Sequence, residues 1–167
     1  MEKIILIATS NVGKVREMEK AFEGLPVRLI PLSHLHEVLP DALPIEEPLE
    51  DGTTFMENAR IKARHYMEQT GLAALADDSG LSVEALGGAP GVYSARYAGV
   101  HGDDAANNAK LIADLRKRGE GHAAAAYHCA LVLVLEDGRE LSAEGTCSGW
   151  IRPEARGTEG FGYDPYF

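Results

Sequence analysis

The chain has 167 residues, of which 45% are hydrophobic and 25% charged, and this composition predicts one globular domain over residues 1–167. Its formal net charge of −10 argues against binding to a nucleic-acid backbone, which requires clustered Lys and Arg side chains. The longest apolar run, Cys129 to Leu135, is far shorter than the roughly 18 residues that a membrane span requires. We therefore expect a cytoplasmic protein with neither a nucleic-acid nor a membrane partner.

The first third of the chain predicts strands that alternate with a helix. Residues Lys3–Thr9 are apolar and β-branched and predict a central strand, and "VREMEKAFEG" predicts a helix that ends near Gly24. Residues 27–32 predict a second strand. From His34 to Asp51 the chain is rich in proline and acidic residues, so we expect a long exposed loop without regular structure.

The middle of the chain predicts a helix, a strand and a loop. Thr53 is expected to cap the helix, which ends at Gly71. The run "LAALA" then predicts a buried strand that stops at Asp77. Residues 81–102 are rich in glycine and show little periodicity, so we expect an irregular loop there.

The last part predicts one more helix and a hairpin. Asp103 is expected to cap a helix, and strands over residues 123–135 and 140–150 flank the turn signal Asp137-Gly138. The expected buried face of the helix has four residues: Ala105, Ala109, Ile112 and Leu115. Together the patterns predict an α/β fold. Its mixed twisted sheet has a long antiparallel hairpin, flanking helices and a ligand cleft at the carboxyl ends of the strands.

The loop from Thr9 to Lys14 is the first candidate site. It joins the carboxyl end of a strand to a helix N-terminus, where unpaired N–H groups and the positive end of the helix dipole favour anions. Hydroxyl and amide donors precede the cation of Lys14. The Walker A pattern is absent, so the loop taken alone favours an ordinary turn in which Ser10 or Asn11 caps the helix.

The second candidate site is "DDSG", where two carboxylates follow an apolar strand. In extended backbone Asp77 and Asp78 point to opposite sides, so at most one faces a given ligand unless the chain turns at Gly80. Adjacent carboxylates there cost stability unless a cation compensates, which favours a function over a surface turn. One or two carboxylates, completed by phosphates and water, suit Mg²⁺. Glu50 is a further candidate ligand, although its acidic neighbours equally indicate a solvated face.

The third candidate site is the segment "GFGYDP" near the end of the chain. Its two glycines permit close backbone approach, and Phe161 or Tyr163 offers a flat face for a nucleobase. Taken alone, the segment favours a structural turn whose aromatic rings fill the core.

Four segments in chain order resemble the motifs of one family: "TSNVGKVREME", "EDGTTFMENARIKA", "ADDSGLSVEALGGAPGVYSARYAG" and "GFGYDP". The family is that of the Ham1/RdgB-type non-canonical purine nucleoside triphosphate pyrophosphatases, also called inosine triphosphate pyrophosphatases. The resemblance covers nearly the whole chain. It implies a homodimeric, Mg²⁺-dependent enzyme that cleaves ITP, dITP or XTP to the monophosphate and pyrophosphate.

The resemblance also implies roles for individual residues. Glu50 and Asp78 would bind Mg²⁺, and Asp78, with Asp77 beside it, would position and deprotonate the attacking water. Lys62 would neutralise phosphate charge, and Ser79 would touch the substrate. The triphosphate would be held by Thr9, Ser10, Asn11, Val12, Gly13 and Lys14. The nucleoside would pack against Phe161, Gly162, Tyr163 and Asp164.

The chain departs from the family pattern at its C-terminus. Family members normally continue past "GFGYDPYF" with a segment whose lysine and Ser-His-Arg run contact phosphate and base, and this sequence stops before it. We therefore expect a C-terminally truncated member. The alternative function is a nucleotide-binding module without turnover, because the base-recognition segment is missing.

Overall fold

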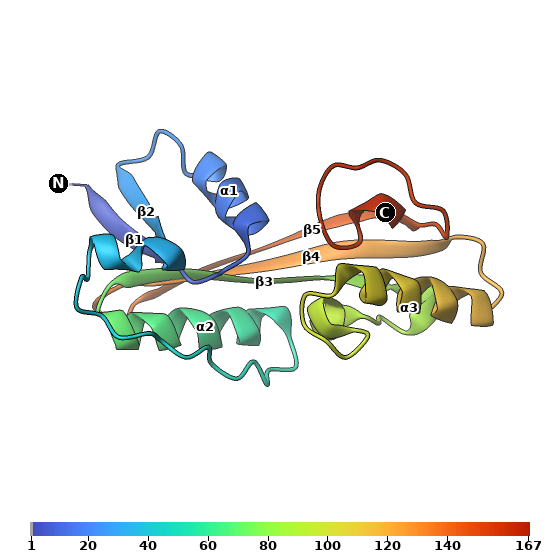
Figure 1. Ribbon diagram of the computed structural model, residues 1–167, viewed down its shortest axis with the longest axis horizontal. Helices are drawn as coiled ribbons and strands as arrows, with labels where there is room; N and C mark the ends of the chain where they lie inside the picture. Colours follow the sequence, from blue (N-terminus) through green and yellow to red (C-terminus); the bar gives the residue numbers. More distant parts are fainter. Residues whose placement is uncertain (1) are drawn as a thin grey trace. The chain divides into compact units, whose positions relative to one another are not determined.

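The computed structural model describes residues 2–167. The strands are β1 (Lys3–Ile7), β2 (Val27–Pro31), β3 (Ala73–Val83), β4 (Ala123–Val134) and β5 (Glu140–Ile151), and the α-helices are α1 (Val12–Ala21), α2 (Phe55–Thr70) and α3 (Asp104–Lys117). The strands lie in the order β2-β1-β3-β4-β5, and β1 is parallel to both of its neighbours (Figure 1). This arrangement confirms the predicted mixed sheet with flanking helices. Within residues 2–167, no helix combines the length and hydrophobicity that a membrane crossing requires.

The chain forms two compact units, and each is described by itself. Unit 1 comprises Met1–Asp78 and Ala130–Glu144, and unit 2 comprises Ser79–Cys129 and Gly145–Phe167.

Unit 1 is a sandwich in which a helix covers each face of the sheet (Figure 1). Side chains of a strand alternate between the two faces, so neighbouring residues enter different cores. The core beneath α1 contains Ile5, Ile7, Met18, Ala73 and Leu75. The core beneath α2 includes Leu6, Ala8, Ala59, Ala63, Tyr66, Ala74 and Ala76. Successive residues of β3 therefore face α1 and α2 in turn.

Unit 2 has its own core, which contains Leu81, Val83, Leu111, Ile112, Leu115, Ala123, Ala125, Ile151 and Tyr163. The buried face of α3 agrees with the expected one only at Ile112 and Leu115. Ala105 and Ala109 are exposed, and Asn107 and Asn108 are buried instead. Burial of Asn107 is tolerated because its side chain accepts a hydrogen bond from the Ala98 N–H (2.8 Å) and donates one to a backbone carbonyl (3.0 Å).

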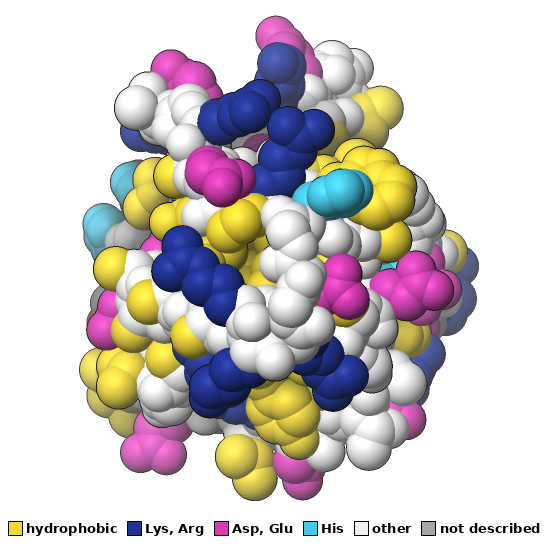
Figure 2. All heavy atoms as spheres, turned by 90° about the vertical axis from the view of Figure 1, so that its right-hand side faces the viewer, with side chains coloured by type: hydrophobic (Ala, Val, Ile, Leu, Met, Phe, Trp, Pro, Cys, Tyr) yellow, Lys and Arg dark blue, Asp and Glu magenta, His cyan; other side chains and the backbone are white. Residues whose placement is uncertain are grey.

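The face of the molecule in Figure 2 carries Lys and Arg side chains in separate groups. Hydrophobic, acidic and uncharged polar side chains lie between these groups. On this face the basic side chains thus do not merge into a single patch.

The prediction that the third strand stops at Asp77 is wrong. Strand β3 continues through Gly80 to Val83, because Leu81 and Val83 resume the apolar alternation and enter the core of unit 2. The stretch predicted as an irregular loop over residues 81–102 therefore begins as a strand. It also contains 3-10 helices at Glu84–Leu86 and Gly91–Arg96.

Two expectations around the proline-rich segment also need correction. A 3-10 helix at Leu32–Glu37 occupies the start of the predicted loop, since Leu35 packs into the core of unit 1. Helix α2 is capped by Thr54 rather than Thr53, because the Thr54 side chain accepts a hydrogen bond from the Glu57 N–H (3.1 Å). The C-terminal boundary of α2 at Gly71 is confirmed.

Candidate active site

The loop between β1 and α1 forms a helix N-terminus with polar residues around it. Asn11 is the N-cap residue, and its side chain accepts a hydrogen bond from the Lys14 N–H (3.2 Å). The Asn11 N–H in turn donates to the Thr9 hydroxyl (3.1 Å). Ser10, Asn11 and Val12 are exposed. The capping role considered for Asn11 is therefore confirmed, and the same turn presents the positive end of the α1 dipole to solvent.

Gly13 and Lys14 lie in the first turn of α1, and the Lys14 side chain reaches β3. Its Nζ lies 2.8 Å from Oδ2 of Asp77, whose side chain is only 3% exposed. Asp77 belongs to the alternating set of β3 that faces α1. The buried carboxylate thus holds the Lys14 ammonium beside the α1 N-terminus.

Asp78 follows on the opposite face of β3, the one covered by α2. Burial raises the pKa of its carboxyl from 3.8 to about 6, and the negative charge of Glu50 adds to this effect. Lys62, a hydrogen bond from the Asn58 side chain and Lys14 act in the opposite direction. Asp78 is therefore held in a partly desolvated environment with cations close enough to favour its charged form.

Glu50 and Lys62 form an ion pair on this same side of unit 1. Lys62 Nζ lies 3.1 Å from Oε1 of Glu50, and the two side chains are 14% and 27% exposed. Lys62 projects from α2, whereas Glu50 precedes that helix in the proline-rich segment. Glu50 is therefore paired and only partly exposed, and its negative charge acts on Asp78.

The segment between Glu50 and α2 is fixed by the first turns of the helix. The Gly52 N–H donates to the Asn58 side chain (2.8 Å), and the Thr53 N–H donates to the Glu57 carboxylate (2.6 Å). A Cβ at Gly52 would lie only 2.7 Å from Asn58 Oδ1, so glycine permits this close approach. The backbone that carries Glu50 is therefore attached to α2 at two points.

A divalent cation suits this set of side chains. Within residues 2–167, Oδ2 of Asp78 is buried without a hydrogen-bond partner. The same residues contain no group of three or more His, Cys, Asp or Glu side chains that could hold a metal. Glu50 and Asp78 offer two hard oxygen donors. This number is sufficient for Mg²⁺, which is typically bound by one or two carboxylates with substrate phosphates and water.

The "GFGYDP" segment lies in unit 2, where hydrogen bonds hold it in shape. The Asp164 carboxylate accepts from the Phe161 N–H (2.9 Å) and from the Tyr127 hydroxyl (2.8 Å). At Gly160, with φ +83°, an added Cβ would collide with Asp164. The Tyr163 ring is buried and its hydroxyl donates to the Ser94 carbonyl, whereas Phe161 remains 40% exposed. Tyr163 therefore fills the core, and Phe161 is the aromatic ring open to a ligand.

Two further contacts of this segment come from α3. The Gly162 N–H donates to the Asp104 carboxylate (3.1 Å), and the Gly162 carbonyl accepts from the Asn108 side chain (2.9 Å). Sequence reasoning missed both partners, because nothing in the spacing of α3 distinguishes an inward-facing amide from an exposed one. Ser79, the remaining candidate, is half-buried on β3 and also belongs to unit 2.

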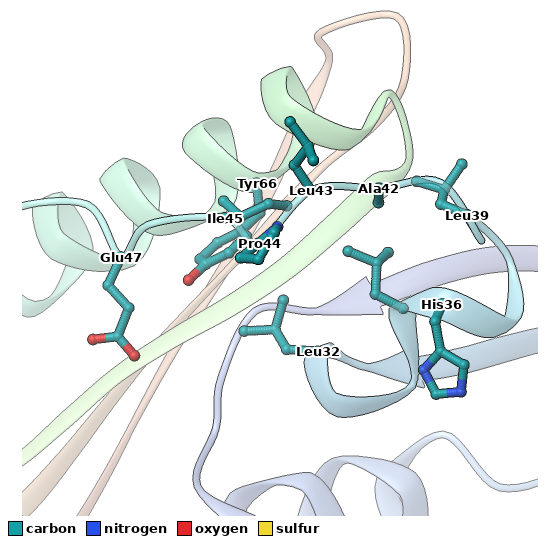
Figure 3. A pocket seen from close by; sticks show the side chains of 10 residues that line it. Leu32, His36, Leu39, Ala42, Leu43, Pro44, Ile45, Glu47 and Tyr66 are labelled. Carbon is teal, nitrogen blue, oxygen red and sulfur yellow. The ribbon is translucent and has the colours of Figure 1, made fainter.

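Unit 1 also contains a cavity of about 310 Å³, lined by apolar side chains together with His36 and Glu47. Figure 3 shows the residues around it, which come from the 3-10 helix, the proline-rich segment and α2. Its lining includes Leu32, Leu39, Ile45 and Tyr66 but none of the candidate site residues. The charged site and the cavity are thus separate features of unit 1.

The sequence profile of the Ham1 family matches residues 5–167. The chain belongs to the Ham1 family. It is 52% identical to the dITP/XTP pyrophosphatase of Acinetobacter baumannii (strain ACICU) over 170 residues, which cover 98% of this chain and 77% of that relative. The family resemblance of its motifs is thereby confirmed.

Solved structures of Ham1-family proteins share the fold. The HAM1 protein from Coxiella burnetii superposes with a TM-score of 0.84 at 40% identity, over 99% of this chain and 81% of that one. The nucleoside-triphosphatase / dITP/XTP pyrophosphatase from Mycobacterium abscessus gives a TM-score of 0.78 at 43% identity, over 98% and 82% of the two chains. The predicted α/β architecture is therefore confirmed by comparison as well as by topology.

Proposed function

We propose that this Ham1-family chain hydrolyses non-canonical purine nucleoside triphosphates, namely dITP, ITP and XTP, to the monophosphate and pyrophosphate. The observation that carries the proposal is the charged site of unit 1. There two lysines, a helix N-terminus and a partly desolvated carboxylate lie within one compact unit. The name of the 52% identical relative, a dITP/XTP pyrophosphatase, supports the same reaction.

The cationic groups of unit 1 bind the triphosphate and neutralise its charge in this proposal. The triphosphate lies against the residues from Thr9 to Lys14, where the α1 dipole and the Lys14 ammonium balance its charge. Lys62 adds a second cation. Such reactions depend mainly on positioning and charge stabilisation, which fixed groups in a partly desolvated site provide.

Glu50 and Asp78 hold Mg²⁺ in this proposal. When bound, the ion supplies charge neutralisation at the phosphates and a water of lowered pKa. Asp78 positions the attacking water and accepts its proton, a role that suits a carboxyl in a partly desolvated site beside Lys62. Asp77, on the other face of β3, acts by anchoring Lys14.

The residues of unit 2 are proposed to contact the rest of the substrate. Ser79 touches the substrate next to Asp78 in sequence. Phe161 and Gly162 pack against the nucleoside, with Phe161 offering its exposed ring. Tyr163 and Asp164 hold the segment in shape through their hydrogen bonds. We propose one pyrophosphatase domain over residues 1–167.

The protein is further proposed to work as a cytoplasmic homodimer. Strand β5 is at the edge of the sheet, and most of its residues are exposed. Leu141 and Trp150 on this strand are 60% and 55% exposed. A long exposed edge strand with apolar side chains favours association, and a second copy of the chain can supply the pairing strand.

Pyrophosphate release from dITP, XTP and dATP tests the proposal, with Mg²⁺ and with EDTA. We expect release from dITP and XTP with Mg²⁺, much less from dATP and none with EDTA. Nucleotide binding without release of pyrophosphate would instead support the alternative, a binding module without turnover. Equal release with EDTA would contradict the role of the metal.

A further inference from the structure

Asn58 is a buried polar residue near the start of α2. Packing of the apolar core gives no reason for an amide at this position. It is 2% exposed, although its helical neighbours Ala59 and Ala63 fill the same side of unit 1 with apolar groups. A buried amide costs free energy unless its donor and acceptor are both used. We therefore ask which groups hydrogen-bond to the oxygen and to the nitrogen of the Asn58 side chain.

The acceptor end of Asn58 binds the segment that carries Glu50. Its Oδ1 accepts the Gly52 N–H at 2.8 Å, and an added Cβ at Gly52 would come within 2.7 Å of the same oxygen. Gly52 lies two residues after Glu50. The contact therefore determines where the Glu50 backbone lies relative to α2.

The donor end of Asn58 serves Asp78, on the strand that α2 covers. The Asn58 side chain is a hydrogen-bond donor to the Asp78 carboxyl. One planar amide thus contacts the Asp78 side chain directly and the Glu50 segment through its backbone. Carboxylates that hold a metal are commonly oriented by such hydrogen bonds, and loss of the partner typically lowers metal affinity by roughly 10-fold to 100-fold.

We propose that Asn58 is a positioning residue that holds the Asp78 carboxyl and the segment carrying Glu50 in place for a divalent cation. This inference rests on the proposed function, because it assigns the two carboxylates to Mg²⁺. It adds a residue that touches neither the substrate nor the metal.

The test is Mn²⁺ binding to the full 167-residue chain without nucleotide, measured by electron paramagnetic resonance of the free ion. Asn58→Leu keeps the approximate volume and removes both hydrogen bonds. Gly52→Ala keeps the Asn58 residue but places a Cβ against its Oδ1, so it disturbs the same contact from the side of the segment, and it lies outside the core. Thr54→Ala is the matched control, because it weakens the start of α2 without touching Asn58 or either carboxylate.

We expect Asn58→Leu and Gly52→Ala each to weaken Mn²⁺ binding by about tenfold or more, and Thr54→Ala to leave it within about twofold. Unchanged affinity in Asn58→Leu, or an equal loss in Thr54→Ala at a similar melting temperature, would overturn the inference. If Asn58→Leu does not fold, Gly52→Ala decides by the same criterion.

The outcome is distinguishable from a failure of the proposed function. If the parent chain binds Mn²⁺ and releases pyrophosphate while the variants bind Mn²⁺ equally well, only the role of Asn58 is lost. If the parent chain binds no Mn²⁺, this result contradicts both the metal site and the role of Asn58.

Discussion

At the scale of single residues, the two neighbouring carboxylates of "DDSG" have different partners. Asp77 faces α1 and pairs with Lys14, whereas Asp78 faces α2 and the group formed by Glu50, Asn58 and Lys62. Their opposite directions could be predicted from strand geometry alone. Their partners could not, because each partner depends on which helix covers which face of the sheet.

Replacement of the Asp78 carboxyl tests two things: its role in catalysis and its effect on the free energy of unfolding. Asp78→Asn should lower the rate of pyrophosphate release by about 10²-fold to 10⁴-fold, the usual contribution of general acid-base catalysis. It should also stabilise the protein, because a carboxyl whose pKa is about 6 in the folded state and 3.8 when unfolded destabilises the fold at high pH.

Because the pKa of Asp78 is higher in the folded than in the unfolded state, its carboxyl destabilises the fold more as pH rises. Below pH 3.8 the carboxyl is protonated in both states and has no effect, and above pH 6 its destabilising effect reaches about 3 kcal/mol. Urea unfolding should therefore show that Asp78→Asn gains about 1.4 kcal/mol more at pH 8 than at pH 5. An equal gain at both values would contradict the raised pKa.

Removal of the Lys14 ammonium tests the ion pair on the other face. Lys14→Met leaves the buried Asp77 without this cation and should lower the free energy of unfolding by about 3 kcal/mol. It should also raise the KM for dITP, since a phosphate-binding charge is lost. In the double variant Lys14→Met/Asp77→Asn, most of the stability but not the KM should return. Independent, additive effects in this cycle would contradict the pairing.

At the scale of elements, the predicted cap of α2 is one residue away from the observed one. Thr53 and Thr54 are adjacent and chemically equal, so residue type alone does not choose between them. The spacing Thr54-x-x-Glu57 is that of a capping box and could have identified Thr54. In the structure, Glu57 reaches back to Thr53 N–H, one residue before the cap.

A comparison of the two threonines tests this assignment. Thr54→Ala should lower the free energy of unfolding by about 1 kcal/mol, because the Glu57 N–H loses its acceptor. Thr53→Ala should cost less than half as much, since its backbone N–H still donates to Glu57. Equal losses for the two variants in urea unfolding would show that the cap is shared.

The other elements were predictable to different degrees. The hairpin followed from Asp137-Gly138, and both of its strands were predicted almost to the residue. Strand β3 was cut short because "DDSG" has the composition of a turn, and only burial of Leu81 and Val83 keeps the chain extended. The inward face of α3 was predicted only in part. Ile112 and Leu115 are buried as expected, whereas the two asparagines were missed because the sequence does not reveal their hydrogen bonds.

At the scale of the whole molecule, the exposed edge strand predicts association. The chain should sediment as a dimer at micromolar concentration, and Leu141→Lys on β5 should shift it to the monomer by placing a charge on the edge. Leu43→Lys is the control, because Leu43 is 82% exposed in the proline-rich segment of unit 1. A monomeric parent chain, or an equal shift to the monomer in the control, would contradict pairing through β5.

The unbroken course of β3 through Asp77 and Asp78 has a consequence for how the family can change. Because consecutive residues alternate between faces, a single inserted or deleted residue between Ala73 and Asp77 would exchange the two carboxylates between α1 and α2. Lys14 would then face the side of β3 that carries Asp78, and Glu50 would face the side that carries Asp77. A change of two residues would keep each carboxylate on its own face but move it about 7 Å along the strand, away from its partners. The site therefore fixes the length of this stretch.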